Sequence, residues 1–494
     1  MADFERFSAG QPAGAWRGRW SWRRRIVVGL AAFALVLGSA VWVLHRAAQV
    51  RRQTEIDLIR AAGEPLTFED LEALREPIPD EQNAALRIIA LFDAMSTEQR
   101  IHLFTISGPH WGWAEIGERW NAEMCEAIEV ALTLQADTLS RVHAAAALER
   151  GAFPNQWSVG VPLIHGGSEV RQATKLLALE ASLRANRGYL DGAMESCDAI
   201  FRISACLANE PFLISLLVRT ASEQMAIGTL ERTLALGEPD EARLRGFHAR
   251  LQRLVGDHES LRRALFGERV VSLAAYSSAR TGATSSLIPS PAYDWVSAML
   301  CLPGFLDRNE QKYLQFMRGW CEASRLPLDE AWPRMKELDA EVANLSVYHA
   351  LAAITLPSLS RAITIYVKCR ARIRAAVAGI EIELYRRANG RWPATLEEAF
   401  ADDPASLPRD PFNANARMQY IVDETGCTIY SLGENEIDDG GSTSVRADIA
   451  FRLLSPHLRG ATVTTQPVDK EVWEAIEALR ATATQPAAAT APVH

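Results

Sequence analysis

Residues 362–390 read AITIYVKCRARIRAAVAGIEIELYRRANG and predict one long amphipathic helix. Its apolar side chains recur at intervals of three and four residues, which places them close to one face of the helix. They are Ile365, Ile373, Val377, Ile380 and Leu384. Asn389 and Gly390 end the helix, because glycine readily takes the left-handed conformation that closes a helical turn.

The residues after this helix predict a small antiparallel sheet. Trp392-Pro393 and Asp410-Pro411 each hold the chain extended, because a residue before proline avoids the helical region. A short helix is expected between them. The remaining elements are two strands at 418–422 and 427–432, a hairpin at 423–426, and an acidic loop at 433–441 that leads to Ala447-Asp448-Ile449.

Four motifs follow one another in this region, namely ELYRRANGRWPATLEEAF, LPRDPFNANARMQY, IYSLGENEIDDGG and ADI. In this order they resemble the periplasmic head domain of the major pseudopilin of type II secretion. That family has a helix ending in Leu-Tyr and Asn-Gly-Arg-Tyr-Pro, followed by Asp-Pro-Trp-Gly, Tyr-Ser-Leu-Gly, Gly-Gly and Asp-Ile. The resemblance covers residues 362–450 and implies a long helix packed on an antiparallel sheet.

The acidic loop has the composition of a cation site. Glu434, Glu436, Asp438 and Asp439 place four carboxylates within six residues, a mutual repulsion that a bound cation relieves. Pseudopilins bind Ca²⁺ at the matching loop, so the resemblance implies calcium ligands here. These are the Leu432 carbonyl and the side chains of Asn435, Asp438, Asp439 and Asp448. Asn435 stands where an aspartate is usual and one extra residue precedes Gly440-Gly441, so a solvated acidic turn without metal is the alternative.

The helix itself departs from the pilin pattern. Pseudopilins carry a cleaved leader and an apolar membrane helix that continues into the head. Here residues 362–388 contain Lys368, Arg370, Arg372 and Arg374, charges that a lipid-spanning helix does not tolerate. We therefore expect a protein that uses the head domain without being processed and polymerised as a pilin.

A membrane segment is predicted near the N-terminus. Residues 26–44 are free of charge and form a helix of about 28 Å at roughly 1.5 Å per residue, which matches the hydrocarbon core of a bilayer. Five arginines precede this segment within residues 17–25 and three follow it within residues 46–52, so the positive-inside rule places the N-terminus in the cytoplasm. We expect a single-pass protein of the bacterial inner membrane, with the bulk of the chain extracytoplasmic.

Two other interpretations of this segment remain open. A basic start, an apolar core and small residues at Gly38 and Ala40 are also typical of a cleaved signal peptide. Residues 41–44 extend the apolar run beyond that site, which favours an anchor. A buried helix of a soluble protein is the third interpretation, although such a helix is rarely apolar on every side.

The middle of the chain, residues 45–361, predicts helices and no convincing strand. Residues 168–187 and 189–208 are each one helix long, and Gly188 between them predicts an antiparallel pair. A third helix is expected from Pro211 to Leu236. Gly188 followed by Ala193 resembles part of a tetratricopeptide repeat, but no regular period is evident, so we expect an irregular stack of helical hairpins. Residues 279–293 predict an exposed loop.

The helical region contains no recognisable catalytic or metal-binding motif. His165-Gly166-Gly167 is superficially similar to the oxyanion loop of esterases, but no G-x-S-x-G motif supplies a nucleophile. The remaining histidines considered show no metal-ligand spacing, and the seven cysteines contain no C-x-x-C pair. A tryptophan cluster at Trp111, Trp113 and Trp120 lines either a cleft or the core. The net charge of −9 argues against a nucleic-acid binder.

The sequence thus predicts a mainly α protein with a single transmembrane helix, an irregular helical-hairpin domain and a small α+β pseudopilin-like domain. The expected parts are a cytoplasmic tail at 1–25, the anchor at 26–44, the helical domain at 45–361, the head at 362–452 and a largely flexible Ala/Thr/Pro-rich tail at 453–494. Within this tail, residues 470–480 can form one short helix. The expected function is that of a scaffold that binds other envelope or secretion proteins. The alternative is an envelope hydrolase or ligand-binding protein with its site in the helical domain.

Overall fold

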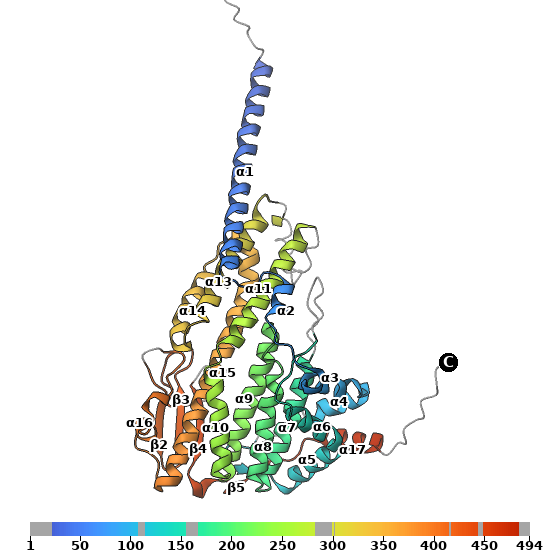
Figure 1. The fold of residues 1–494 in the computed structure, drawn as a ribbon, viewed down its shortest axis with the longest axis vertical. Coiled ribbons are helices and arrows are strands. Elements are labelled where there is room, and N and C mark those ends of the chain that lie inside the picture. The colour runs from blue at the N-terminus through green and yellow to red at the C-terminus, as the bar shows by residue number, and fades with distance from the viewer. Residues whose placement is uncertain are drawn as a thin grey trace, which may run out of the picture.

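The computed structural model describes residues 22–106, 114–154, 166–281, 299–300, 302–413, 416–442 and 448–483. It confirms a mainly helical chain with a small antiparallel sheet in the C-terminal region. Helix α1 (Trp22–Ala61) projects from one end of an elongated body, and the three-stranded sheet lies toward the opposite end (Figure 1). The expected loop at 279–293 lies almost entirely outside the described residues.

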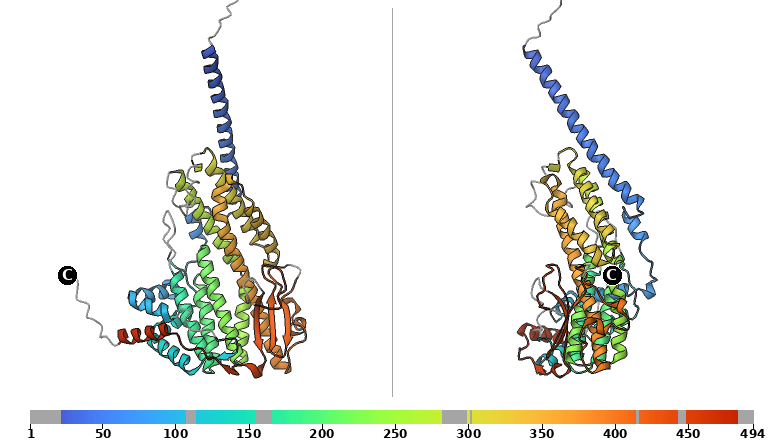
Figure 2. Two further views of the ribbon diagram at one scale, coloured as in Figure 1. Left: turned by 180° about the vertical axis from the view of Figure 1, so that it is seen from behind. Right: turned by 90° about the vertical axis from the view of Figure 1, so that its left-hand side faces the viewer.

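Helix α1 has two parts with different surroundings. Its apolar part, residues 26–44, is exposed along its whole length. Its second part packs against α13 (Phe305–Ala323), where Ala48 and Ile59 are buried and Glu55 accepts a hydrogen bond from Arg318 at 3.1 Å. Both views of Figure 2 show the first part standing clear of the body.

In the described chain, two segments are long and apolar enough to cross a membrane, Trp22–Ala61 and Val347–Asn389. The second is half buried within the body. It contains α15 (Ala350–Asn389), which begins well before the predicted helix start and so runs across the expected boundary at 361/362. The helical part and the head therefore share one helix.

The helices of the body surround α7 (Gly167–Asn186), α8 (Leu190–Ala205) and α9 (Leu213–Leu236), which pack on one another. Gly188 has φ +84° in the turn between α7 and α8, as the predicted hairpin requires. The other helices are α2 (Phe68–Ala73), α3 (Ala84–Asp93), α4 (Thr97–Ile106), α5 (Ala122–Leu134), α6 (Ala136–Ala146), α10 (Glu241–Val255), α11 (Glu259–Arg280) and α14 (Leu328–Ala343).

The sheet has the order β2-β3-β4 and is antiparallel throughout. Its strands are β2 (Gln419–Asp423), β3 (Gly426–Ser431) and β4 (Ile449–Leu454), and α16 (Leu396–Ala399) precedes them. The strands β2 and β3 confirm the predicted hairpin, whereas β4 was not predicted as a strand. Helix α15 packs on β3 and β4, and Gly379 lets it approach, because a Cβ there would lie 2.5 Å from the ring of Phe451.

The chain from residue 453 to residue 483 packs on the body, where a largely flexible tail with one short helix at 470–480 was expected. Strand β5 (Thr462–Val463) pairs in parallel with β1 (Glu118–Arg119), and α17 (Lys470–Ala483) packs on α4 and α5. Val472 and Ile476 are fully buried and Leu479 is nearly so. Their spacing forms an apolar stripe along α17. Burial of this stripe offsets the conformational entropy that the tail loses when it becomes ordered.

Candidate functional site

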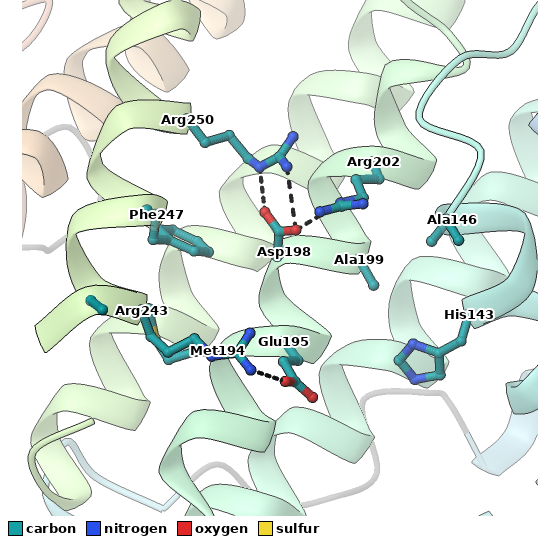
Figure 3. Close-up of a pocket in the computed structure, with 13 residues that line it drawn as sticks. His143, Ala146, Met194, Glu195, Asp198, Ala199, Arg202, Arg243, Phe247 and Arg250 are labelled. Atoms are coloured by element: carbon teal, nitrogen blue, oxygen red, sulfur yellow. Dashed lines mark hydrogen bonds and ion pairs between the residues drawn. The ribbon is translucent and has the colours of Figure 1, made fainter. Parts of the chain in front are cut away.

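A groove of about 550 Å³ lies between α6, α8 and α10 (Figure 3). Helix α8 contributes Glu195, Asp198 and Arg202, which share its outward face because they are three or four residues apart. The opposite face of α8 is buried in the core. The groove therefore presents charged side chains above an apolar floor, which is formed by Ala146, Ala147, Met194, Ala199 and Phe247.

The charged groups of the groove pair with one another. Asp198 lies between Arg202, whose Nε donates at 2.7 Å, and Arg250, which contacts both carboxylate oxygens (Figure 3). Arg243 Nη2 donates to Glu195 Oε1 at 2.5 Å. Arg202 also lies 3.0 Å from Glu149, so each of the three guanidinium groups already has an acidic partner. The groove therefore presents an apolar lining bordered by paired charges of both signs, a composition that protein-binding surfaces share.

His143 at the edge of the groove belongs to a buried cluster around Glu180. His143 Nε2 and Ser196 Oγ each lie 2.7 Å from Glu180 Oε2, and Arg184 is 2.6 Å from Glu180 Oε1. Burial raises the pKa of Glu180, but His143, Ser196 and Arg184 outweigh it, so the pKa lies below its usual value. The carboxylate stands between the hydroxyl and the imidazole, whereas a hydrolytic triad needs the imidazole in the middle. The cluster therefore gives no support to the hydrolase interpretation.

A second cavity of about 460 Å³ lies along α9, between α7, α15 and the loop at 114–116. Arg232 lines it, lies 4.9 Å from the centre of the Trp120 ring, and donates to the carbonyls of Ala114 and Glu118 at 3.4 and 3.1 Å. Burial lowers the pKa of Arg232 to about 10. The geometry is that of a clamp holding the 114–119 loop on α9. Trp120 is thus a core residue, and Trp111 and Trp113 lie outside the described residues.

The other histidines considered from the sequence lie apart from one another. His102 faces Glu98 at 3.7 Å, His248 faces Glu381 at 3.1 Å, and His349 lies 3.3 Å from the Ser346 hydroxyl. Burial lowers the pKa of His258, which sits at the start of α11. His110 and His165 fall outside the described residues. Within the part of the chain that the structure describes, no three His, Cys, Asp or Glu side chains come together as a metal site.

The acidic loop of the head is organised around Asp448, which is 4% exposed. Its Oδ2 accepts the backbone N–H groups of Asp439 at 3.1 Å and Gly441 at 2.7 Å, while its buried Oδ1 has no hydrogen-bond partner. Burial raises the pKa of Asp448. The Tyr430 hydroxyl donates a hydrogen bond to Asp438 Oδ1 at 3.0 Å.

The other expected ligands lie on the same loop. The Asn435 amide donates to Asp439 Oδ2 at 3.3 Å. At the base of the loop, the Leu432 N–H donates to Asp410 at 3.0 Å. The structure thus brings Asp438, Asp439 and Asp448 around the Gly440-Gly441 turn, although their carboxylates do not converge on one point. The oxygen atoms of these side chains are of the type that Ca²⁺ takes, and the unpaired Oδ1 of Asp448 is available to a cation, but the described residues do not form a preassembled metal site.

Two buried ion networks were not anticipated from the sequence. Glu383 accepts hydrogen bonds from Arg386, Arg387 and, from the tail, Arg459. Arg370 of α15 pairs with Glu223 of α9, and Arg219 pairs with Glu223 and Asp257. Each network combines pairs three or four residues apart on one helix with long-range pairs, and spacing gives no signal for the long-range pairs Glu383–Arg459 and Arg370–Glu223. Both networks join α15 to its neighbours.

Comparisons of the chain with protein-family models, curated proteins and solved structures found no match. The geometry of the described residues therefore carries the functional inference.

Proposed function

We propose that this protein is a single-pass anchored scaffold of the bacterial inner membrane, whose extracytoplasmic body binds other envelope proteins. The observation that carries the proposal is the division of α1. Residues 26–44 are apolar and exposed, so they need a lipid environment, while residues 45–61 are packed on the body. The body is thereby held directly at the membrane surface.

The second apolar helix, α15, supports a single crossing better than two. Arg370 and Glu383 on this helix are buried and ion-paired within the body. Exposing these charges to lipid would require breaking both networks, which is costly in a medium without water. Helix α15 is thus an internal spine of the body.

The orientation follows from the arginines that flank the anchor, and a reporter fusion tests it. Alkaline phosphatase fused after His494 should be active in cells, because this enzyme folds only outside the cytoplasm. A cytoplasmic reporter fused at the same residue should be inactive. The opposite pattern would overturn the proposed topology.

For the binding role, the groove between α6, α8 and α10 is the surface that we assign to a partner. A photo-crosslinking amino acid at Ala242, which lines the groove, should capture an envelope protein in living cells. The matched control is Ala249 on the same helix, which is exposed but not among the groove residues. Equal capture at both positions would refute a specific groove.

A charge change should then abolish the capture. Arg243→Glu replaces a guanidinium of the groove, whereas Arg245→Glu alters a neighbouring exposed arginine paired with Glu241. Crosslinking through Ala242 should be lost in the first variant and retained in the second. Loss in both would indicate general destabilisation of α10.

The head supports a link to type II secretion or another surface assembly. Its long helix packed on a three-stranded antiparallel sheet has the architecture that the resemblance implies. Asp410 of the Asp-Pro motif accepts hydrogen bonds from the Ser431 hydroxyl at 2.7 Å and the Phe412 N–H at 2.9 Å, which ties the motif to the end of β3. Two of the motifs quoted from the sequence, LPRDPFNANARMQY and IYSLGENEIDDGG, thus meet at Asp410.

Calcium is part of this proposal. Asp448, Asp439, Asp438, Asn435 and the Leu432 carbonyl would hold the ion, which would neutralise the loop and join it to β4. Added CaCl₂ should raise the melting temperature of the detergent-solubilised protein, because a ligand that binds only the folded state stabilises it. Asp448→Asn should abolish the rise. An unchanged melting temperature at millimolar calcium would leave the solvated acidic turn as the correct interpretation.

A further inference from the structure

The end of the body that adjoins the anchor carries an exposed corner that the binding groove does not explain. We call it the membrane-side corner. It consists of Leu302, Arg308, Lys312, Val347, Tyr348 and His349. Leu302 precedes α13, Arg308 and Lys312 lie in the first half of α13, and the other three form the short turn Val347–His349 that precedes α15.

The position of this corner along the anchor is fixed by contacts with α1. Gly304 lies so close to α1 that a Cβ on it would be 3.3 Å from the Cα of His45. The His45 ring is 3.9 Å from Asp307. His45 directly follows the apolar segment 26–44, so the start of α13 lies at the level where that segment ends. In Figure 1 this end of the body reaches up alongside α1.

Three large apolar side chains of the corner face outward. Leu302 is 51% exposed, Val347 is 56% and Tyr348 is 60%. Their backbone is held firmly, because the Asn309 amide donates to the Tyr348 carbonyl at 3.1 Å and its oxygen accepts the Leu351 N–H at 3.0 Å. The apolar groups are thus presented by a fixed turn packed on α13.

The charge beside these residues is positive although the chain is acidic overall. Arg308 and Lys312 form no ion pair with any described carboxylate, and both lie close enough to His349 to lower its pKa, together with burial. The two acids in the first turns of the same helix, Asp307 and Glu310, are buried and paired with Arg52 and Arg280. The outward charge of the corner is therefore cationic.

We propose that the membrane-side corner rests on the lipid headgroups of the bilayer that α1 crosses. Leu302, Val347 and Tyr348 lie in the interfacial zone, where an apolar body with a polar end is favoured, and Arg308 and Lys312 face the phosphates of anionic lipids. A second attachment point beside the anchor fixes the tilt of the body, so the groove and the head are held at a set distance from the membrane. This inference rests on the proposed membrane span.

The test uses the full chain in nanodiscs rich in anionic lipid, with one fluorescent label per variant. The labelled positions are Tyr348→Cys in the corner, Ile437→Cys in the head and Val36→Cys in the anchor, each combined with Cys301→Ser. The six other cysteines are buried and do not compete for the label. Spin-labelled lipid reports contact with the bilayer, and a water-soluble quencher reports exposure to solvent.

Labels at 348 and 36 should be quenched by the lipid probe and the label at 437 by the soluble probe. If the label at 348 behaves like that at 437 while the label at 36 stays in lipid, the corner proposal fails and the span stands. If the label at 36 is also in water, the proposed span fails. If the label at 348 is shielded from both probes, a protein covers the corner and the lipid assignment is wrong.

Charge reversal provides the second arm. Arg308→Glu with Lys312→Glu should shift the label at 348 toward water by about fivefold per cation removed from an anionic surface. Zwitterionic nanodiscs should give a similar loss with the unaltered corner. The control is Arg334→Glu on α14, an exposed arginine paired with Glu337 away from the corner, which should leave the lipid quenching unchanged. Quenching that is insensitive to both changes would overturn the electrostatic part.

Discussion

At the scale of single residues, Glu383 connects two parts of the chain that no sequence motif linked, helix α15 and the tail. Its carboxylate is fully buried and accepts hydrogen bonds from Arg386 at 3.0 and 2.8 Å and from Arg459 at 3.0 and 2.8 Å. Burial raises the pKa of Glu383, but these hydrogen bonds and charges lower it to about 2. The head helix is thereby fastened to the tail.

Glu383→Gln should lower the free energy of unfolding by about 3–5 kcal/mol at neutral pH, because it removes the buried carboxylate that Arg386, Arg387 and Arg459 share and leaves Arg386 and Arg459 only the partly exposed Glu238. The folded-state pKa is below the unfolded value, so the stabilisation is present above about pH 4.3 and is lost as the pH falls through about 2. The melting temperatures of the two proteins should therefore differ by a constant amount from pH 7 to about pH 4.3 and approach each other as the pH falls from there toward about 2. Glu381→Gln, which affects only the contact with His248, is the control and should change little.

The residues of the candidate sites differ in how far sequence could predict them. Asp438, Asp439 and Asp448 are close in sequence and belong to motifs, so their meeting at the Gly440-Gly441 turn could be anticipated. The groove could not be predicted, because His143, Asp198 and Arg250 come from three helices whose packing depends on the tertiary fold. The ion pair between Glu383 and Arg459 could not be predicted for the same reason.

At the scale of elements, the contact between α15 and the sheet depends on Gly379. Gly379→Ala should destabilise the protein by about 1–2 kcal/mol, because overpacking against the buried ring of Phe451 exceeds the gain in helix propensity. Gly246→Ala in α10 is the matched control, since a Cβ there meets nothing within 4 Å. That change should stabilise by about 0.5–1 kcal/mol. Thermal unfolding of both variants checks the difference in sign.

The packed part of the tail offers a second prediction. Ile476→Asp should detach α17, because a carboxylate at a fully buried position of the interface with α4 and α5 loses its hydration without gaining a partner. Hydrogen exchange should become fast in residues 470–483 and stay slow in α15. Glu477→Ala, on the exposed side of α17, should leave exchange unaltered. Protection of α17 in the Ile476 variant would contradict the docking.

Elements with a strong local pattern could be predicted from the sequence, whereas those that depend on contacts with distant segments could not. The α7–α8 hairpin, α9 and the β2–β3 hairpin lie within a few residues of their predicted positions. Strand β4, with the sequence IAFRLL, lacks the alternation of a half-buried strand and becomes one through its pairing with β3. Helix α17 begins at Lys470, where a short helix at 470–480 was expected, but its packing on α4 and α5 depends on the tertiary fold and could not be predicted.

At the scale of the whole molecule, α15 and α1 give the protein its long axis. The predicted boundary at 361/362 separated a helical domain from a head, but α15 passes through it and packs on α9, α10, α13, α14 and the sheet. The motifs mark where the resemblance begins in the sequence, but this point is not a structural boundary, because α15 packs on elements on both sides of it. The head and the helical part should therefore unfold together.

The two parts of α1 make opposite contributions that truncation can separate. A chain of residues 45–494 should be soluble without detergent and should melt at the temperature of the full chain, because residues 26–44 are exposed and bury no side chain in the body. A chain of residues 62–494 should melt lower, since it loses the buried Ile59 and leaves Arg318 without Glu55. Removing one fully buried isoleucine alone costs about 2–5 kcal/mol in other cores. If both truncated chains melted alike, the packed half of α1 would contribute nothing to the fold, and the anchor would be attached to the body by a flexible tether.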